Sequence, residues 1–429
     1  MLEGFQKNAD TPWSLNSVIS LRYTRFRFRS DVRAALILAL QAFPICLAIS
    51  VASGVPPLNG IYCAAAATFL ASALGESGVR ICAPNVIFIG VASGIVSTSG
   101  IHGLSLCTML AGLILTLLTV TRLGAAVRFM PRAVTNGFST GIAILVISGL
   151  IADFLGLRIA IPTGGLAAIT IGVTSHLNTI SSQATFLATV TMILSLAFRK
   201  VLEIPVRLAA IVIGALLVKA YNWPLETVAT RIGFPSFQPY PLMSRHIEPG
   251  MLIGMFSLAL PVAILVAIES LRASALASNL SGERHDPSVE LLVDGGANIA
   301  CSLLGGLPAS GSSLQTAANV RSGAQTPMGG MMQALFLLAL LLLTGPLIQF
   351  IPLATISAIL LTDICRMAHW REIPNLLKRS RAETGAWLLT LFVTIVADLP
   401  TAVAAGMFLA LFLSIPKPTA IGSDKPPVS

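Results

Sequence analysis

Charged residues are scarce in this sequence: they make up 10% of its 429 residues, whereas a soluble globular protein carries about 25%. Aromatic residues are also few, at 6%, while 55% of the residues are hydrophobic. A chain with so few charges cannot cover a compact core with water-facing side chains. The composition therefore excludes an ordinary soluble domain.

Several functional patterns are missing as well. The arginine-rich start has no short apolar core followed by a small-residue cleavage site, so no cleavable signal peptide is expected. The six cysteines lie in or beside apolar runs without CxxC spacing, which favours buried free thiols over disulfides or metal sites. Without a metal-ligand cluster, a nucleophile elbow or a phosphate-binding loop, we expect no enzyme, no metal and no cofactor. The net charge of +9 has a topological explanation and does not indicate nucleic acid.

Long apolar runs are abundant, and about 20 apolar residues suffice to cross a bilayer. The sequence therefore predicts an all-α polytopic membrane protein. We expect fourteen spanning or half-spanning segments, several of them too short to cross alone, near residues 31–54, 56–74, 84–98, 103–121, 132–152, 184–199, 205–220, 250–281, 287–304, 311–322, 327–347, 352–366, 382–397 and 400–415.

The distribution of basic residues supports this count. With both termini in the cytoplasm, most of the 27 lysines and arginines fall on the cytoplasmic side, as the positive-inside rule requires. The opposite side receives only Arg158, Lys219, Arg231 and Arg245, and Arg272 lies inside a segment. We therefore expect a multi-pass protein of the inner (plasma) membrane with cytoplasmic termini.

Fourteen segments divide into two halves of seven that would run in opposite directions, which is the inverted-repeat plan of many transporters. The third segment of each half is interrupted by glycine, proline and small polar residues: "RICAPNVIFIGVASG" (80–94) and "GGLPASGSSLQTAANVRSG" (305–323). Such paired interruptions point to a transporter's binding site.

Each interrupted segment is expected to be a short extended strand followed by a half-helix. Ile81–Ala83 and Leu307–Ser310 would be extended, and Pro84 would occupy the first position of its helix. Two helix N-termini that face each other at membrane depth make an anion site. The side chains of Asn85, Ser310, Ser312 and Ser313 would add donors. The alternative is that these small residues only permit tight helix packing.

Glu269 and Arg272 are two ionisable residues inside the eighth segment, "LVAIESLRASALASNL". Ionisable groups at membrane depth are costly and mark functional sites. Because they are spaced i,i+3, the two side chains share a helix face and could simply neutralise each other. The other interpretation is a coupling carboxylate with a nearby cation.

Several long blocks of the sequence resemble the SulP anion transporters, a family that includes sulfate permeases, bicarbonate transporters, dicarboxylate carriers and prestin. The blocks are "SGVPPLNGIYCA" (53–64), "MPRAVTNGFSTGIAILVISG" (130–149), "FIPLATISAIL" (350–360) and the stretch from "VAIESLRASALASNL" (266–280) to "LLGGLPASGSSLQTAANVRSGAQTP" (303–327). The resemblance implies a core domain that moves against a gate domain. It also implies an anion between the third and tenth half-helices, with contributions from the first and eighth segments.

The resemblance also implies roles for individual residues. Glu269 matches the acid of the eighth helix that couples transport to sodium or protons. Gln315 falls where most members carry an arginine that offsets the anion's charge, and Arg272 where members often have leucine. The resulting candidates are Glu269 and Arg272 for the coupling ion and, for the substrate, Gln41, Phe43, Asn85, Ser310, Gly311, Ser312, Ser313 and Gln315.

The domain organisation expected from these inferences has a cytoplasmic segment (1–30), a transporter domain (31–415) and a short cytoplasmic tail (416–429). The core would comprise about 31–121 and 250–347, and the gate about 132–220 and 352–415. The family's cytoplasmic STAS domain does not follow the last segment here, so this is either a short member or a truncated chain.

The function expected is secondary active transport of a small anion, such as a sulfate-like anion, bicarbonate or a dicarboxylate, with sodium or protons co-transported. The expected partners are the anion and the lipid bilayer, without nucleic acid, and a homodimer is left open. The alternatives are a nucleobase transporter of the same fold and a non-transporting membrane module.

Overall fold

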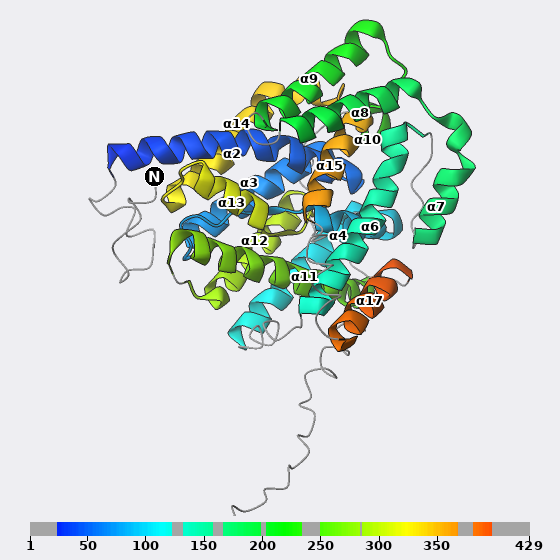
Figure 1. Ribbon diagram of the computed structural model, residues 1–429. Helices are drawn as coiled ribbons and strands as arrows, with labels where there is room; N and C mark the ends of the chain where they lie inside the picture. The colour runs from blue at the N-terminus through cyan, green and yellow to red at the C-terminus, as the bar shows by residue number, and fades with distance from the viewer. Residues whose placement is uncertain are drawn as a thin grey trace, which may run out of the picture.

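The structure is a computed structural model that describes residues 24–121, 132–157, 166–198, 203–233, 249–283, 285–367 and 381–396. It is mostly helical (Figure 1). The described residues form 14 α-helices and a single two-stranded sheet. The expected segment 400–415, the tail 416–429 and the first 23 residues lie outside the described residues.

The first part of the chain contains α2 (Arg25–Ala52), α3 (Pro57–Leu74), β1 (Cys82–Pro84), the 3₁₀ helix η1 (Val86–Phe88) and α4 (Ile89–Val120). The hydroxyl of Thr24 caps α2 by accepting a hydrogen bond from the Arg27 N–H, and Pro57 occupies the first turn of α3. The sequence predicted separate segments at 84–98 and 103–121. The structure agrees with this division, because α4 is interrupted between the two segments by a kink at Gly100, whose φ of 67° favours glycine.

The middle of the chain contains α6 (Arg132–Leu155), α7 (Leu166–Ser175), the 3₁₀ helix η2 (Leu177–Thr179), α8 (Ser182–Ala197), α9 (Glu203–Tyr221) and α10 (Val228–Ile232). The helix α7 was not among the expected segments. It has ten residues, about half the length that crosses a bilayer.

The last part contains α11 (Pro249–Ser281), α12 (Pro287–Leu304), β2 (Ala309–Gly311), α13 (Ser313–Arg321), α14 (Pro327–Ile348), α15 (Leu353–Met367) and α17 (Arg381–Val396). In the described residues, six helices are long and apolar enough to cross a membrane: α2, α3, η1 with α4, α6, α11 and α14. On α14, Leu335, Leu342 and Leu343 are exposed, as expected for side chains that face lipid.

Helices from the first part of the chain and α6 pack against helices that follow α10. Helix α12 packs on α4, and α14 packs on α3 and α2, while α17 and α15 pack on α6. Small residues permit the close approach of α4 and α12: a Cβ added to Gly112 would lie 2.7 Å from the carbonyl oxygen of Gly295. The largest hydrophobic cluster includes residues from α2, α3, α4, α11 and α12, together with Cys82, Ala83 and Ala309 of the two strands.

Two arginines assigned to cytoplasmic loops by the charge count are buried. Arg207 on α9 binds Asp363 on α15 with two nitrogens, at 2.6 and 3.1 Å, and both side chains are 1% exposed. Arg80 precedes β1 and is ion-paired with α12, and it is 2% exposed. These two arginines hold helices together, so their positions do not support an orientation of the chain in the membrane.

Candidate functional site

The two interrupted stretches meet in space. Strands β1 and β2 pair in antiparallel orientation, with Cys82 opposite Gly311, Ala83 opposite Ser310 and Pro84 opposite Ala309. The Ser312 N–H extends the pairing by donating to the Ile81 carbonyl, at 2.8 Å. The starts of the helices that follow the two strands are therefore neighbours, although they are more than 220 residues apart in the chain.

Side chains from neighbouring helices satisfy the backbone of this small sheet. The hydroxyl of Thr68 on α3 donates to the Cys82 carbonyl at 2.7 Å. On the β2 side, the amide of Asn298 on α12 both donates to the Ala309 carbonyl, at 2.8 Å, and accepts from the Ala309 N–H, at 3.0 Å. Irregular backbone at membrane depth requires such partners. The arrangement makes the sheet a fixed platform for the two helix starts.

Each helix start has a polar cap. Asn85 caps η1, and its Oδ1 accepts from the Ile87 N–H at 3.3 Å. Ser312 caps α13, and its Oγ accepts from the Gln315 N–H at 3.3 Å. The expectation that Pro84 begins a helix is wrong. Pro84 is the last residue of β1, where its missing N–H costs no ladder hydrogen bond at the strand end, and the helical turn begins after Asn85.

Three buried polar atoms on or next to the strand pair make no hydrogen bond within the described part of the chain. They are Nδ2 of Asn85, Oγ of Ser310 and Oε1 of Gln315. All three side chains are at most 5% exposed. Because buried polar groups are normally hydrogen-bonded, three unpaired atoms around one strand pair point to a polar ligand at this site. Ser313, the first residue of α13, is partly exposed beside them.

Gln41 and Phe43, the candidates on α2, are buried at 7% and 5% exposure. Helix α2 contacts both α13 and β1, so it forms one wall around the helix starts. The N–H of the remaining candidate, Gly311, donates to the hydroxyl of Ser270 on α11, at 3.0 Å. That N–H is therefore already used, and Gly311 serves the site by allowing α11 to lie close to β2.

Glu269 and Arg272 lie beside this contact on α11. Nη1 of Arg272 is 3.3 Å from Oε1 of Glu269, and the Glu269 side chain is 7% exposed. Nη2 of Arg272 donates to the hydroxyl of Thr135, at 3.2 Å, and to Oδ1 of Asn136, at 2.7 Å. Both acceptors are on α6. The intrahelical pair considered from the sequence is therefore present, and it is also tied to a second helix.

The buried ion pairs of Arg80 were not predicted. Its Nε is 2.6 Å from Oε2 of Glu290, and its Nη1 and Nη2 lie 2.8 and 2.9 Å from the two carboxylate oxygens of Asp294. An added Cβ at Gly311 would lie 2.8 Å from Nη1, so Arg80 is close to β2. Because two carboxylates offset its charge, Arg80 offers an anion no net positive charge. The i,i+4 spacing of Glu290 and Asp294 was the available sequence signal.

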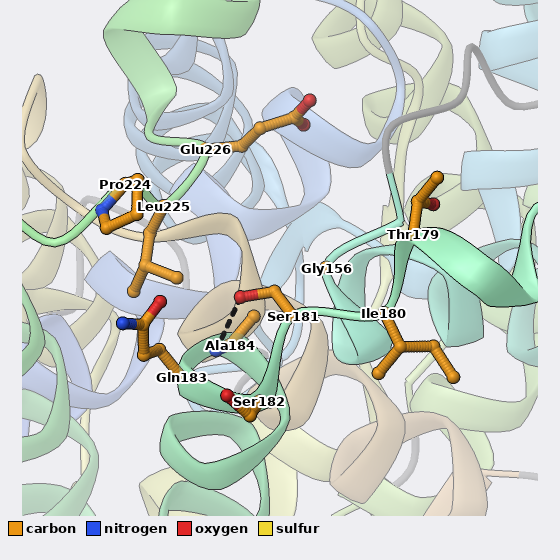
Figure 2. Close-up of a pocket in the computed structure, with 10 residues that line it drawn as sticks. All are labelled: Gly156, Thr179, Ile180, Ser181, Ser182, Gln183, Ala184, Pro224, Leu225 and Glu226. Carbon is orange, nitrogen blue, oxygen red and sulfur yellow. Dashed lines mark hydrogen bonds between the residues drawn. The ribbon is translucent and has the colours of Figure 1, made fainter.

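A separate cavity of about 450 Å³ lies between the end of α6, the start of α8 and the segment before α10. Its lining includes Gly156, Ser181 and Glu226, and Figure 2 shows the Ser181 hydroxyl accepting a hydrogen bond from Ala184. None of the candidate site residues lines this cavity. It is therefore distinct from the strand pair.

Comparison with known proteins agrees with this arrangement. The sequence profile of the sulfate permease family matches residues 28–390. A putative sulfate transporter of Bacillus subtilis, YvdB, is 30% identical over 401 residues, which cover 92% of this chain and 74% of the relative. The bicarbonate transporter BicA of Picosynechococcus is 29% identical over 425 residues, covering 92% of this chain and 72% of the relative.

Solved structures share the fold. The transmembrane domain of a cyanobacterial bicarbonate transporter BicA aligns with a TM-score of 0.74 and 25% identity, covering 91% of this chain and 98% of that chain. The structure of SLC26A9 aligns with a TM-score of 0.82 at 15% identity, covering 93% of this chain and 68% of that chain, which shows the fold alone. The family match spans most of the chain, and the relatives are transporters and not enzymes. The chain therefore belongs to the sulfate permease family of membrane anion transporters.

Proposed function

We propose that this protein is a secondary active transporter that binds a small anion between the starts of η1–α4 and α13. The observation that carries the proposal is the antiparallel β1–β2 pair, which gathers Asn85, Ser310 and Gln315 with their unpaired buried polar atoms. The names of the relatives make sulfate and bicarbonate the first substrates to consider, and a dicarboxylate is a third.

The chemistry of the site suits an anion. Both helices present N-terminal backbone N–H groups and the positive end of the helix dipole. Nδ2 of Asn85 and Oγ of Ser310 are free donors, and rotation of the Gln315 amide would present its nitrogen in place of Oε1. Gln41, Phe43, Gly311, Ser312 and Ser313 would form the walls around the anion.

Two inverted repeats of seven segments would explain the packing. Helix α12 packs on α4 as α14 packs on α3, and the strands that precede α4 and α13 run antiparallel. The proposed core contains about 31–121 and 250–347, and the proposed gate about 132–220 and 352–415. Alternating access would follow from movement of the core against the gate, in an inner (plasma) membrane protein with both termini cytoplasmic.

Glu269 is the proposed coupling group, with sodium or a proton as the co-transported cation. Its carboxylate is buried on α11, one residue before Ser270, which binds β2. A buried carboxylate next to the residue that contacts β2 would link cation binding to anion binding.

The direct test is uptake of labelled sulfate, bicarbonate and oxalate by the purified protein in proteoliposomes, with and without sodium and proton gradients. Uptake of at least one of these anions is expected. If wild-type protein takes up none of them under either gradient, the proposed function is wrong.

Ser310→Ala locates the binding site. Its hydroxyl makes no hydrogen bond within the described residues, so its removal should leave the fold intact. A lost hydrogen bond to a charged ligand costs about 1.5–3 kcal/mol, which corresponds to a rise in KM of roughly tenfold or more. Ser195→Ala is the matched control, because its hydroxyl on α8 is also buried and unpaired. Equal KM values for the two variants would place the anion elsewhere.

A further inference from the structure

Arg80, Arg207 and Arg272 lie in the helical bundle, and they differ in how they are held. Arg80 and Arg207 each bind one carboxylate with two nitrogens, at 2.6–3.1 Å, and both side chains are 1% exposed. Arg272 binds one carboxylate oxygen with one nitrogen, at 3.3 Å, and its side chain is 26% exposed. Of the three guanidinium groups, that of Arg272 is the one that a ligand could reach and take over.

Arg272 also lies close to the proposed anion site. Ser270 and Ala273 face β2, because the hydroxyl of Ser270 binds the Gly311 N–H and Cβ of Ala273 is 2.9 Å from an ideal Cβ at Gly311. Successive residues of an α-helix are about 100° apart, so Glu269 lies between this face and the face of Arg272, which binds α6. The carboxylate therefore separates the guanidinium from the strand pair.

We propose that Arg272 supplies the positive charge that binds the transported anion, and that Glu269 withholds it until Glu269 takes up a proton. This inference rests on the proposed function and identifies its coupling ion. One proton adds to the Glu269 carboxylate, and the guanidinium keeps its own proton throughout. Neutral Glu269 no longer attracts Arg272, so an anion at the helix starts competes for the guanidinium only with the neutral acceptors Thr135 and Asn136. Proton and anion then favour each other's binding by the same factor, which is the requirement for symport.

The same geometry disfavours sodium at this carboxylate. A sodium ion on Glu269 would lie next to the guanidinium that already contacts Oε1, and two like charges at that distance repel. A proton neutralises the carboxylate without adding a second cation. Gln315 on α13 is neutral, so it can donate a hydrogen bond to the anion but cannot supply the positive charge.

Other titratable groups on the elements that contact α11 are engaged with other partners or lie apart from Glu269. Among the described residues, Arg272 is the ion-pair partner of Glu269. Glu290 and Asp294 on α12 are bound to Arg80, and Asp153 on α6 is bound to Arg231. The remaining titratable groups on α4, α12 and α13 are His102, Cys107, Cys301 and Arg321.

The experiment measures the apparent KM for anion uptake against pH in proteoliposomes. The probe is whichever of sulfate, oxalate and bicarbonate the wild-type protein takes up most. Uptake of sulfate or oxalate is measured from about pH 6 to 8, and uptake of bicarbonate above about pH 7. Each anion stays mostly ionised in its range. Wild-type KM is expected to fall by up to about tenfold per unit decrease in pH, without dependence on sodium.

Three variants test the two residues separately. Glu269→Gln should show, at every pH, the low KM that wild type reaches in acid, and a pH gradient should no longer drive accumulation. Arg272→Gln should raise KM by roughly tenfold or more and abolish the pH dependence. Arg272→Lys keeps the charge and should restore part of both. Arg321→Gln, at the exposed end of α13, is the matched control and should retain the wild-type profile.

Two results would overturn the inference while leaving anion transport itself established. One is a folded Arg272→Gln variant with the wild-type KM and pH profile. The other is wild-type uptake that requires sodium and does not change with pH. If Arg272→Gln fails to fold, as judged by size-exclusion chromatography, a pH-dependent KM in Glu269→Gln contradicts the inference equally well. Absence of uptake of every anion by wild type would instead reject the proposed function.

Discussion

Helix α11 lies close to the strand pair at Gly311, and Gly311→Ala tests whether that approach is required. An ideal Cβ at this position would lie 2.8 Å from Nη1 of Arg80, 2.9 Å from Cβ of Ala273 and 3.0 Å from Cα of Ser270. All three neighbours are held in place. Arg80 is fixed by two carboxylates, and the other two atoms belong to the helix α11 itself. The alanine can therefore be accommodated only if β2 moves away from α11.

The expected cost follows from two contributions. Overpacking a well-packed site costs about 1–3 kcal/mol. Separation of β2 from α11 also breaks the hydrogen bond from the Gly311 N–H to the Ser270 hydroxyl, worth about 0.5–1.5 kcal/mol. We expect a loss of stability of about 2–4 kcal/mol, together with weaker anion binding, because Ser310 and Ser312 would move with β2.

The assay is the thermal unfolding midpoint of the purified protein in detergent, followed by KM for anion uptake. Gly296→Ala is the matched control: this glycine lies on α12, is exposed, and has no atom within 4 Å of an added Cβ. It should leave KM unchanged and stabilise the helix by up to about 1 kcal/mol. If Gly311→Ala unfolds at the wild-type temperature and binds the anion normally, the close contact between α11 and β2 has no functional importance.

Three further predictions concern charge and topology. Gln315→Arg adds a positive charge at the start of α13. The ratio of KM for sulfate to KM for a monovalent anion such as nitrate should fall by about tenfold. An unchanged ratio would count against the site. Asp363→Asn removes the buried carboxylate that binds two nitrogens of Arg207 and should destabilise the protein by about 3–5 kcal/mol, as measured by the unfolding midpoint. Arg207→Met with Asp363→Leu should recover most of that loss. Single cysteines at Asn222 and Arg379 should react with a membrane-impermeant reagent from opposite sides, and labelling of both from one side would reject the fourteen-segment topology.

The proximity of the two interrupted stretches could be predicted from the sequence. Glycine, proline and serine in a chain of apolar runs indicate irregular backbone, and their matched positions indicated that they belong to one site. The structure brings them together as β1 and β2. The strand boundaries were wrong by one to two residues. Pro84 fits a strand end as well as a helix start, and only the partner strand decides between the two.

The partners that charged residues find far away in the sequence could not be predicted. Arg80 binds Asp294 across 214 positions and Arg207 binds Asp363 across 156, and nothing local in the sequence links them. Both arginines fit a cytoplasmic loop equally well by the charge count. The bonds from Arg272 to α6 were missed for the same reason, although Asn136 lies in a block quoted for the family resemblance. The kink at Gly100, in contrast, lies at the break that the sequence predicted between the segments 84–98 and 103–121.

The contacts of α11 divide between two parts of the protein, and this division connects anion binding to movement. Ser270 holds α11 to β2, whereas Arg272, two residues later, holds it to α6. In the proposed core-and-gate arrangement, β2 belongs to the core and α6 to the gate. Movement of the core therefore preserves the Ser270 contact and must break the Arg272 contacts to Thr135 and Asn136. Hydrogen bonds from a charged group contribute about 1.5–3 kcal/mol each, enough to hold one state until another acceptor replaces them. An anion that binds Arg272 is such an acceptor, so the group that recognises the substrate would also release the core from the gate.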